Sequence, residues 1–356
     1  MNTIGHIFRL TTFGESHGAA IGGVIDGCPS RLKLDFDFID SELDRRKTAQ
    51  NPMASQRKES DRVEWLSGLL DGVTLGTPIA FMVRNEYCKP ADYEALKEVY
   101  RPSHADFTYE QKYGLRDWRG GGRASARTTL PIVVAGAIAK QILQGEGISV
   151  CAEVTEMGDA QQAQQEGDTV GGIVECRIIG ASAGLGEPMF GKFSAELAHA
   201  MFSLPAVKGF EIGDGFALAK MKGSEANDTF INMEDLGLRT WRRETKDGPS
   251  IGLGPFCPQS SVPQSSVKIT TLTNHSGGIQ GGISNGNDIV FRVAFKPIPS
   301  IAKPQQTVNQ AGEPCKIAIE GRHDVCALPR AVVLVEALAA LVTVDMMRLI
   351  SSSRSY

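Results

Sequence analysis

Cysteine is sparse and unpatterned in this sequence. The 356 residues include seven cysteines but no C-x-x-C pair, and an odd number of cysteines cannot form a complete set of internal disulfides. This pattern argues against a zinc ribbon and against a disulfide framework. We therefore expect reduced, buried thiols in a protein of the cytoplasm, and no bound metal.

The sequence also has no excess of positive charge and no long uncharged apolar run. Its 37 Lys and Arg against 41 Asp and Glu give a formal net charge of -4, and aromatic residues make up only 7%. Because a nucleic-acid binder needs a basic patch and stacking aromatics, we expect no nucleic-acid partner. The most apolar segment, residues 331–350, contains Glu336, Asp345 and Arg348, so it predicts a buried helix rather than a membrane span. The N-terminus lacks the pattern of a signal peptide.

Glycine and arginine are concentrated in one stretch, residues 113–143. Gly120, Gly121 and Gly122 are consecutive, and an Ala/Val/Ile-rich segment with helical character opens at Pro131. Glycines let backbone N–H groups approach a ligand, and a helix N-terminus adds partial positive charge. Residues 112–127 also include five basic side chains and one acid. Since guanidinium groups suit phosphate and carboxylate, we predict an anion-binding cradle; a solvated basic loop is the alternative.

Two histidines lie in polar turns. Residues 14–18 read Gly-Glu-Ser-His-Gly, which matches the nucleophile elbow of serine hydrolases and makes Ser16 a candidate nucleophile. An elbow needs earlier strands to supply an oxyanion loop, however, and only thirteen residues precede this motif. His17 is the more interesting candidate, as an exposed acid or base, and His104 lies in a similar turn after Pro102. A structural role is the alternative for each histidine.

The remaining pattern predicts one mixed α/β domain over residues 1–356. Strands are expected at 79–84, 151–158 and 170–179, and helices at 40–47, 92–98 and 196–202. Residues 206–220 read as two strands joined by a hairpin at Gly213-Asp214-Gly215. Residues 228–271 are rich in glycine, proline and serine and predict a surface insertion, and a short disordered tail is expected at 351–356.

Three separated blocks of the sequence resemble the signature regions of the chorismate synthase family. They are GESHGAAIGGVIDGCP (14–29), GGRASARTTLPIVVAGAI (121–138) and RHDVCALPRAVVLVEAL (322–338). The likeness covers nearly the whole chain except the expected insertion. It implies a β-α-β sandwich, with antiparallel sheets around central helices, assembled as a homotetramer.

The resemblance also implies a reaction. Members of the family convert 5-enolpyruvylshikimate-3-phosphate to chorismate and phosphate by a 1,4-anti elimination, the last step of the shikimate pathway of aromatic amino-acid biosynthesis. The ring hydrogen that leaves is not acidic, and the family uses reduced FMN, thought to lend an electron to the substrate and take it back. NADPH is a candidate flavin reductant, and an external flavin reductase is a candidate partner. An arginine-rich pocket suits a substrate with two carboxylates and a phosphate.

Matched position by position, the family motifs imply roles for individual residues. His17 would protonate the departing phosphate, His104 would set the protonation of the flavin, and Asp324 would act beside the flavin as a base or relay. The arginines expected to hold the substrate or NADPH are Arg46, Arg101 and Arg127. The residues expected to hold the flavin are Arg123, Ala124, Ser125, Ala206, Gly281, Lys296, Pro297, Ile298, Pro299, Ser300 and Arg322.

Three positions depart from the family pattern. Pro52 occupies a flap position where many relatives have an arginine, so Arg57 or Lys58 is the candidate substitute. Val325 follows the Arg-His-Asp motif where proline is usual, which affects the rigidity of the turn more than its chemistry. Pro205, in a predicted flavin-binding loop, cannot donate a backbone N–H to the flavin.

Overall fold

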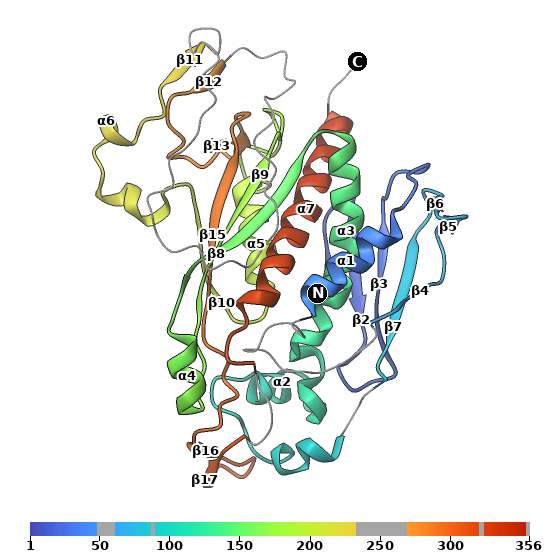
Figure 1. Cartoon of the computed structure of the whole chain (residues 1–356), viewed down its shortest axis with the longest axis vertical. Coiled ribbons are helices and arrows are strands. Elements are labelled where there is room, and N and C mark those ends of the chain that lie inside the picture. The colour runs from blue at the N-terminus through green and yellow to red at the C-terminus, as the bar shows by residue number, and fades with distance from the viewer. Residues whose placement is uncertain (48–60, 87–89, 233–268, 320–323, 354–356) are drawn as a thin grey trace.

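Two antiparallel β-sheets enclose a layer of helices (Figure 1). The computed structural model describes the whole chain except residues 48–60, 87–89, 233–268, 320–323 and 354–356. The main helices are α1 (Phe36–Arg46), α3 (Leu130–Gly145), α5 (Phe193–Phe202) and α7 (Leu328–Ser353). Helix α3 packs on the first sheet and on α7, and α7 packs on the second sheet. This arrangement confirms the predicted α/β sandwich.

The first sheet has the strand order β1-β2-β3-β7-β4, and every neighbouring pair is antiparallel. Its strands are β1 (Thr3–Ile4), β2 (Arg9–Phe13), β3 (Ala20–Asp26), β7 (Ile79–Arg84) and β4 (Val63–Trp65). Alternate residues of β7 point into the core, because Ile79, Phe81 and Val83 are almost completely buried. The loop between β2 and β3 contains the Gly-Glu-Ser-His-Gly motif, so the sheet fixes its position.

The second sheet has the strand order β10-β15-β9-β8, also antiparallel throughout. Its strands are β10 (Val207–Ile212), β15 (Ile289–Phe295), β9 (Gly172–Ile179) and β8 (Ser149–Met157). Val174 and Cys176 of β9 and Phe291 and Val293 of β15 are completely buried against the helices. Lys296 follows the last residue of β15, so this sheet sets the start of the predicted flavin-binding loop.

Helices α3 and α7 cross at a position where no side chain fits. A Cβ atom on Gly136 of α3 would lie 2.3 Å from the Cβ atom of Ala337 on α7. Small residues at such a crossing let two helix backbones approach closely. Pro131 occupies the first turn of α3, where its missing N–H breaks no helical hydrogen bond. The glycine-rich stretch therefore leads directly into a helix that is tightly packed in the core.

A cluster of charged side chains, in which Glu42 and Glu336 are buried and Arg45 is partly exposed, joins three helices to the second sheet. Glu336 of α7 accepts hydrogen bonds from Arg45 of α1 at 2.7 and 2.9 Å, from Lys140 of α3, and from the backbone N–H of Ala152 on β8 at 3.0 Å. Arg45 and Lys140 also donate to Glu42 of α1. Burial disfavours the charge of Glu336, but its hydrogen bonds and charge pairs with Arg45 and Lys140 outweigh burial and lower its pKa.

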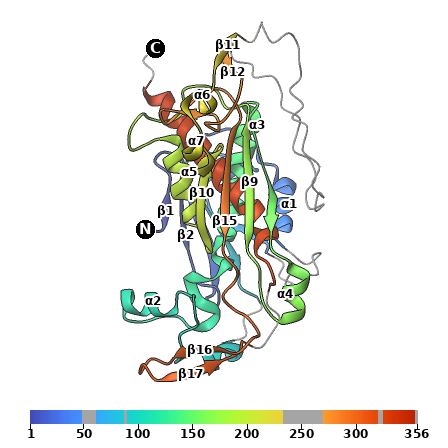
Figure 2. The same cartoon turned by 90° about the vertical axis from the view of Figure 1, so that its left-hand side faces the viewer.

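Short elements complete the fold (Figure 2). Helix α2 and the β16–β17 hairpin lie at one end of the sandwich, and strands β11 and β12 lie at the other. The short elements are β5 (Leu69–Leu70), β6 (Val73–Thr74), η1 (Pro90–Leu96), α2 (Asp106–Tyr113), η2 (Arg119–Ala124), η3 (Ala126–Thr129), α4 (Ala160–Glu166), η4 (Gly215–Lys220), α6 (Gly223–Ala226), β11 (Phe230–Asn232), β12 (Ile269–Thr271), β13 (Ile279–Gln280), β14 (Ile283–Ser284), β16 (Gln305–Val308) and β17 (Pro314–Ile317).

Most of the predicted elements are present, with one clear error. The predicted strands correspond to β7, β8 and β9, and the predicted helices correspond to α1, η1 and α5. The hairpin predicted for residues 206–220 is wrong, because only β10 is a strand there and Gly215–Lys220 forms the 3-10 helix η4. Strand β10 pairs instead with β15, which comes much later in the chain.

The described residues bear on parts of four other predictions. The ends of the predicted insertion pair as β11 and β12, and residues 233–268 lie outside the described residues. Helix α7 continues to Ser353, so residues 351–353 of the predicted tail are helical.

The prediction of reduced thiols is wrong at Cys151, which is disulfide-bonded. Free thiols are present at Cys28, Cys176, Cys315 and Cys326. None of the helices that the structure describes is long and apolar enough to span a membrane.

We expect Gly136→Ala to destabilise the fold even though alanine favours helices. The added methyl group would overlap Ala337, and overpacking of a core costs roughly 1–3 kcal/mol. Gly145→Ala, at the end of the same helix, is the control, because a Cβ atom there meets nothing within 4 Å. The control should leave stability unchanged or raise it by up to about 1 kcal/mol. Urea unfolding measures both, and equal stability of the two variants would contradict the tight crossing.

Candidate active site

The glycine run of η2 lies against both predicted catalytic histidines. Gly120, Gly121 and Gly122 have φ angles of 59°, 80° and 52°, a left-handed conformation that glycine adopts without strain. A Cβ atom on Gly120 would lie 2.2 Å from the Cε1 and Nδ1 atoms of His17. A Cβ atom on Gly121 would lie 3.2 Å from Cε1 of His104. This turn therefore brings the two histidines to one place, and it needs glycine for space as well as for conformation.

His17 is held on several sides in the loop between β2 and β3. Its ring makes an edge contact with Tyr93 of η1, with the ring centroids 5.1 Å apart. Ser16 Oγ lies 3.2 Å from Nδ1 of His17 and donates a hydrogen bond to the carbonyl oxygen of Gly120 at 3.1 Å. The sequence predicts an exposed histidine here, but only 8% of the residue is exposed. His17 is therefore a buried, oriented group.

The geometry does not support a serine hydrolase. The hydroxyl of Ser16 donates to a backbone carbonyl, and only 1% of the residue is exposed. Its loop joins two antiparallel strands, β2 and β3, whereas a nucleophile elbow joins a strand to a helix. The match to the elbow motif instead reflects a loop that places the neighbouring His17.

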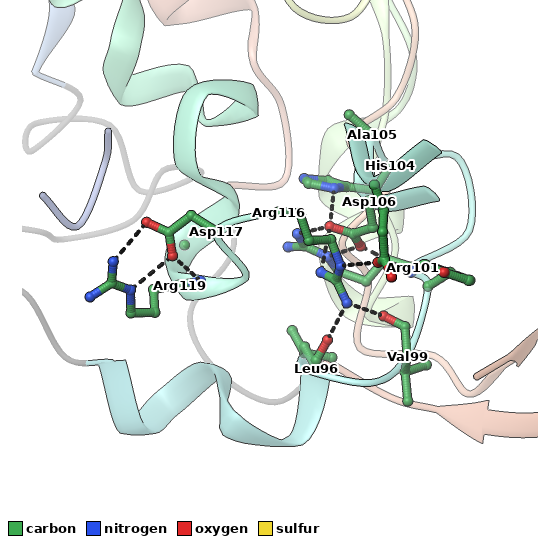
Figure 3. A network of polar contacts seen from close by, with 12 residues as sticks. Leu96, Val99, Arg101, His104, Ala105, Asp106, Arg116, Asp117 and Arg119 are labelled. Atoms are coloured by element: carbon green, nitrogen blue, oxygen red, sulfur yellow. Dashed lines mark hydrogen bonds and ion pairs between the residues drawn. The ribbon is translucent and has the colours of Figure 1, made fainter. Parts of the chain in front are cut away.

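His104 belongs to a buried network centred on Asp106 (Figure 3). Nδ1 of His104 lies 3.0 Å from Oδ1 of Asp106, while the guanidinium group of Arg101 donates to both carboxylate oxygens at 2.7 Å. Arg116 lies 3.2 Å from the same carboxylate and donates to three backbone carbonyls of residues 96–99. Burial disfavours the charge of Asp106, but Arg101 and His104 outweigh it and hold the pKa of Asp106 well below its usual range.

The charge on Asp106 determines the tautomer of His104. An ionised carboxylate only accepts hydrogen bonds, so the proton lies on Nδ1 of His104 and the lone pair of the neutral ring lies on Nε2. Nε2 is on the side of the ring that faces Gly121. The sequence predicts that Arg101 holds the substrate. In the structure Arg101 donates to both carboxylate oxygens of Asp106, and through Asp106 it orients His104.

Arg46 and Arg127, the other two arginines predicted to hold the substrate, share one carboxylate. Arg127 of η3 donates to Asp61 at 2.9 Å and to the side-chain oxygen of Asn85 at 2.6 Å. Arg46, at the end of α1, lies 3.9 Å from the same Asp61 and donates to a backbone carbonyl of η3 at 3.0 Å. All three charged side chains are almost completely buried. The fold therefore brings Arg46 and Arg127 to the same carboxylate.

Asn85 connects these arginines to the loop that contains His17. Its side-chain amide donates to the carbonyl oxygens of Glu15 and Gly18 at 3.0 and 2.8 Å. These two residues flank Ser16 and His17 on either side. Because Asn85 also accepts from Arg127, the arginines and His17 belong to one continuous hydrogen-bond network.

Asp324, the third predicted catalytic residue, is paired with Arg330 at the start of α7. Nε of Arg330 lies 3.2 Å from Oδ2 of Asp324, and Nη2 donates to Oδ1 at 3.3 Å. Both side chains interact electrostatically with Arg46, whose pKa falls to about 10 because of burial and the like charge of Arg330. Nε of Arg46 has no hydrogen-bond partner among the described residues. Three guanidinium groups, on Arg46, Arg127 and Arg330, thus face two carboxylates, on Asp61 and Asp324.

Part of the predicted flavin-binding set lies beside the His104 loop. The ammonium group of Lys296 donates to the backbone and hydroxyl oxygens of Ser103, the residue before His104. The backbone N–H of Lys296 donates to the carbonyl oxygen of Ala206 at 2.9 Å, and Ala206 has a left-handed φ of 70°. The end of β15, the start of β10 and the His104 loop therefore meet.

The other described residues of the predicted flavin-binding set lie in η2, at the start of η3 and in the loop after β15. Ser125 caps η3 by accepting a backbone N–H two residues later, and Ala124 beside it is half-buried. Arg123 donates to the backbone oxygen of Gly14 at 3.1 Å and to Thr12 at 2.8 Å, so its guanidinium group holds the end of β2. The residues after Lys296 form an irregular, partly exposed loop of Pro297, Ile298, Pro299 and Ser300.

Within one chain, Gly281 does not lie beside Lys296 and the His104 loop. It forms the turn of the β13–β14 hairpin, next to the start of β15, whereas Lys296 follows the end of that strand. A strand of this length spans about 20 Å. Four further sequence predictions concern residues outside the described part of the chain, namely Arg322 and the flap residues Pro52, Arg57 and Lys58.

Sequence reasoning missed four residues of the network. Asp106 follows His104 by two positions, and from there its carboxylate reaches Nδ1 of His104. Of the four residues, only Asp106 could have been found from a local sequence pattern. Asp61 and Asn85 lie in loops whose partners are distant in the sequence, so no local pattern points to them. Arg330 stands in an apolar segment that reads only as the start of a helix.

The arrangement is that of an α/β enzyme with histidines and arginines gathered in one region. Two histidines meet at a backbone turn without side chains, and three arginines, Arg46, Arg127 and Arg330, lie in the adjoining network with Asp61 and Asp324. Buried charge of one sign calls for a partner of the other sign, and paired histidines suit proton transfer. The site is therefore built for acid–base chemistry on an anionic small molecule.

Comparisons with known proteins identify the family. The chorismate synthase family model matches the chain over residues 8–165 and 159–348. Chorismate synthases of Opitutus terrae, Porphyromonas gingivalis and Bacteroides thetaiotaomicron are 46%, 47% and 46% identical to it, each over 97% of this chain and over 96%, 95% and 97% of their own length. A crystal structure of chorismate synthase aligns with a TM-score of 0.70 at 26% identity, over 97% of this chain and 93% of that one. The chain belongs to the chorismate synthase family and is a carbon–oxygen lyase.

Asp106→Asn should lower the stability of the protein and change its pH dependence. Breaking a buried charge pair of this kind costs on the order of 3–5 kcal/mol at neutral pH. Because the pKa of Asp106 in the folded state lies below its ordinary value of 3.8, its contribution is complete above that pH and is lost as the pH falls below it. The difference in unfolding free energy between wild type and variant should therefore shrink in acid. A difference that stays constant down to low pH would contradict this reading.

Proposed function

We propose that the chain converts 5-enolpyruvylshikimate-3-phosphate to chorismate and phosphate by a 1,4-anti elimination that uses reduced FMN. The observation that supports this most directly is the meeting of His17 and His104 at the Gly120–Gly121 turn. The same network contains Arg46, Arg127 and Arg330, and guanidinium groups suit a substrate with two carboxylates and a phosphate. The shikimate pathway, and with it aromatic amino-acid biosynthesis, is the biological setting of this reaction.

The described residues fit such a pair of ligands. The buried Nε of Arg46 has no described hydrogen-bond partner, which is what a site for an external anion requires. The turn at Gly120–Gly121 offers backbone where a side chain on Gly120 would collide with His17 and one on Gly121 would crowd His104. Reduced FMN, when bound, would supply an electron to the substrate transiently, with no net redox change. The described residues that would hold it are Arg123, Ala124, Ser125, Ala206, Lys296, Pro297, Ile298, Pro299 and Ser300.

His17 would act as the general acid for the departing phosphate. Ser16 donates its hydroxyl proton to Gly120, so its oxygen is available to accept a hydrogen bond from Nδ1–H of His17. This arrangement leaves Nε2 of the imidazolium ring to donate its proton to the phosphate oxygen. The contact with Tyr93 fixes the ring in that orientation.

His104 and Asp324 would manage protons on the flavin side of the site. Asp106 keeps a proton on Nδ1 of His104, so Nε2 is the atom that would hold or release a proton toward the reduced flavin. Asp324 would act as a base or relay for the ring proton of the substrate, with its carboxylate oriented by Arg330. Each group is placed before the substrate arrives, which reduces the reorganisation needed in the transition state.

We further propose the cellular setting that the family implies. The protein would act on its small phosphorylated substrate in the cytoplasm, as a homotetramer, without a nucleic-acid or membrane partner. Electrons for the flavin would come from NADPH, held in part by Arg46, or from an external flavin reductase. Pro52 removes the flap cation that many relatives present to such ligands, so Arg57 or Lys58 would take its place.

Alanine at either histidine should slow turnover strongly. General acid–base groups contribute about 100-fold or more, so His17→Ala and His104→Ala should each lose at least that factor in kcat. Both variants should still unfold cooperatively, which circular dichroism checks. Anaerobic phosphate release with chemically reduced FMN gives the rates. Wild-type rates in both variants would remove the histidines from the mechanism.

Phosphate release should depend on the redox state of the flavin. Under anaerobic conditions we expect turnover with chemically reduced FMN and none with oxidised FMN alone, because the proposed elimination needs an electron donor. Oxidised FMN plus NADPH then separates the two reductant sources: turnover means that the chain reduces its own flavin, and no turnover means that it needs a reductase. Release from oxidised FMN without any reductant would overturn the proposed mechanism.

A further inference from the structure

Asn85 follows the last residue of β7 and is bonded to the turn that contains His17. Its side-chain NH2 group donates to the carbonyl oxygens of Glu15 and Gly18 at 3.0 and 2.8 Å. The backbone N–H of Gly18 donates to the same carbonyl of Glu15 at 3.0 Å, which closes a tight turn around His17. The backbone N–H of Asn85 also donates to the carbonyl oxygen of Ala19 at 3.2 Å. Asn85 therefore bridges the two ends of the turn.

The glycine run of η2 holds the middle of the same turn. The backbone N–H of Ser16 donates to the carbonyl oxygen of Gly122 at 3.3 Å, and its hydroxyl donates to that of Gly120 at 3.1 Å. The turn thus has one anchor at its centre and another, Asn85, at both ends. Since His17 is one of the two central residues of the turn, a shift at either anchor changes where its ring points.

A carboxamide suits position 85 because it donates and accepts at once. While its nitrogen donates to the turn, its oxygen accepts from Nε of Arg127 at 2.6 Å. Backbone carbonyls only accept and a guanidinium group only donates, so these partners fix which way the amide points. A carboxylate of the same shape would still accept from Arg127 but could not donate to the turn. Position 85 therefore needs an amide to join the two.

We infer that Asn85 is a positioning residue for the proposed general acid His17, and that it ties the His17 turn to Arg127. This inference rests on the proposed function. Asn85 acts through the turn and touches no reacting atom. It keeps the imidazole ring in place relative to an arginine predicted to hold the substrate. Such placement matters, because moving a catalytic group by about 1 Å can cost roughly 100-fold in rate.

Two substitutions separate the two halves of the amide's role. Asn85→Asp keeps an acceptor for Arg127 and removes both donors to the turn, whereas Asn85→Ala removes all three bonds of the side chain. Both should lower kcat roughly 10- to 100-fold in anaerobic phosphate release with saturating reduced FMN, with the KM for the substrate changed less than about threefold. Wild-type kcat in both, or a loss confined to Asn85→Ala, would overturn the inference.

A double-mutant cycle shows whether the effect passes through His17. If it does, Asn85→Asp should cost nothing further in a His17→Ala background. Losses that multiply would mean that Asn85 acts independently of His17, which contradicts the proposed role. Asn85→Asp, which keeps the shape of the side chain, carries this test even if Asn85→Ala fails to fold.

Hydrogen exchange of the backbone amides of residues 13–20 tests the anchor in the flavin-free protein. Exchange there should be faster in both Asn85 variants than in wild type, with little change in the core helices. The matched control is Asn287→Asp, whose amide likewise donates and accepts, here with Thr271 and Thr270 at the end of β12. The control should leave both kcat and the exchange of residues 13–20 unchanged.

The exchange measurement also keeps the two proposals apart. Unchanged exchange of residues 13–20 in the Asn85 variants would overturn the role of Asn85 while leaving the proposed function standing. Failure of the wild-type protein to release phosphate with reduced FMN would instead remove the proposed function, and the part that His17 plays in it.

Discussion

Two imidazole rings can approach the same backbone turn only if that turn has no side chains. Gly120 and Gly121 meet this condition, and their left-handed conformation is one that other residues rarely adopt. The turn leads through η3 into α3, which is tightly packed against α7, so the position of the glycines is set by the core. The position of His17 relative to His104 is therefore set by the backbone of the Gly120–Gly121 turn, against which both loops pack.

The electrostatics of the site follow from how its arginines share the described carboxylates. The protein is acidic overall, yet the network around Arg46 has more guanidinium groups than carboxylates among the described residues. Asp106 behaves differently, since it pairs with Arg101 and Arg116 and also fixes the orientation of His104. One carboxylate thus orients a histidine, while Asp61 is shared between Arg46 and Arg127. A solvated basic loop, the alternative interpretation of the sequence, would show no such division.

Local patterns predicted the layers of the fold well, because period-two burial and a proline-initiated apolar helix are local properties. Strand β7 and helix α3 are examples of each. The hairpin expected after β10 failed because Gly213 and Gly215 adopt positive φ for a close contact and a 3-10 turn, while β10 finds its partner far along the chain. The Gly-x-Ser-x-Gly match, kept only as an alternative, is not supported, since its meaning depends on whether a helix or a strand follows.

The candidate site was predictable only where a residue belongs to a recognisable block. His17, His104 and Arg127 could be found because each lies in a conspicuous glycine-, proline- or arginine-rich stretch. Asp61, Asn85 and Arg330 could not, because their importance arises from partners brought close by folding. The same limit applies to Gly281, which a family motif assigns to the flavin but which one chain places by the start of β15.

Arg45 and Arg46 are consecutive residues of α1, and consecutive helical side chains point about 100° apart. The first belongs to the Glu336 cluster in the core and the second to the Asp61 network in the site. A rotation of the helix about its axis would therefore disturb both at once. Replacing a buried charge cluster by apolar side chains can leave stability unchanged. Here such a replacement would remove one of the contacts that set the rotation of α1, so it can leave the melting temperature unchanged and still shift Arg46.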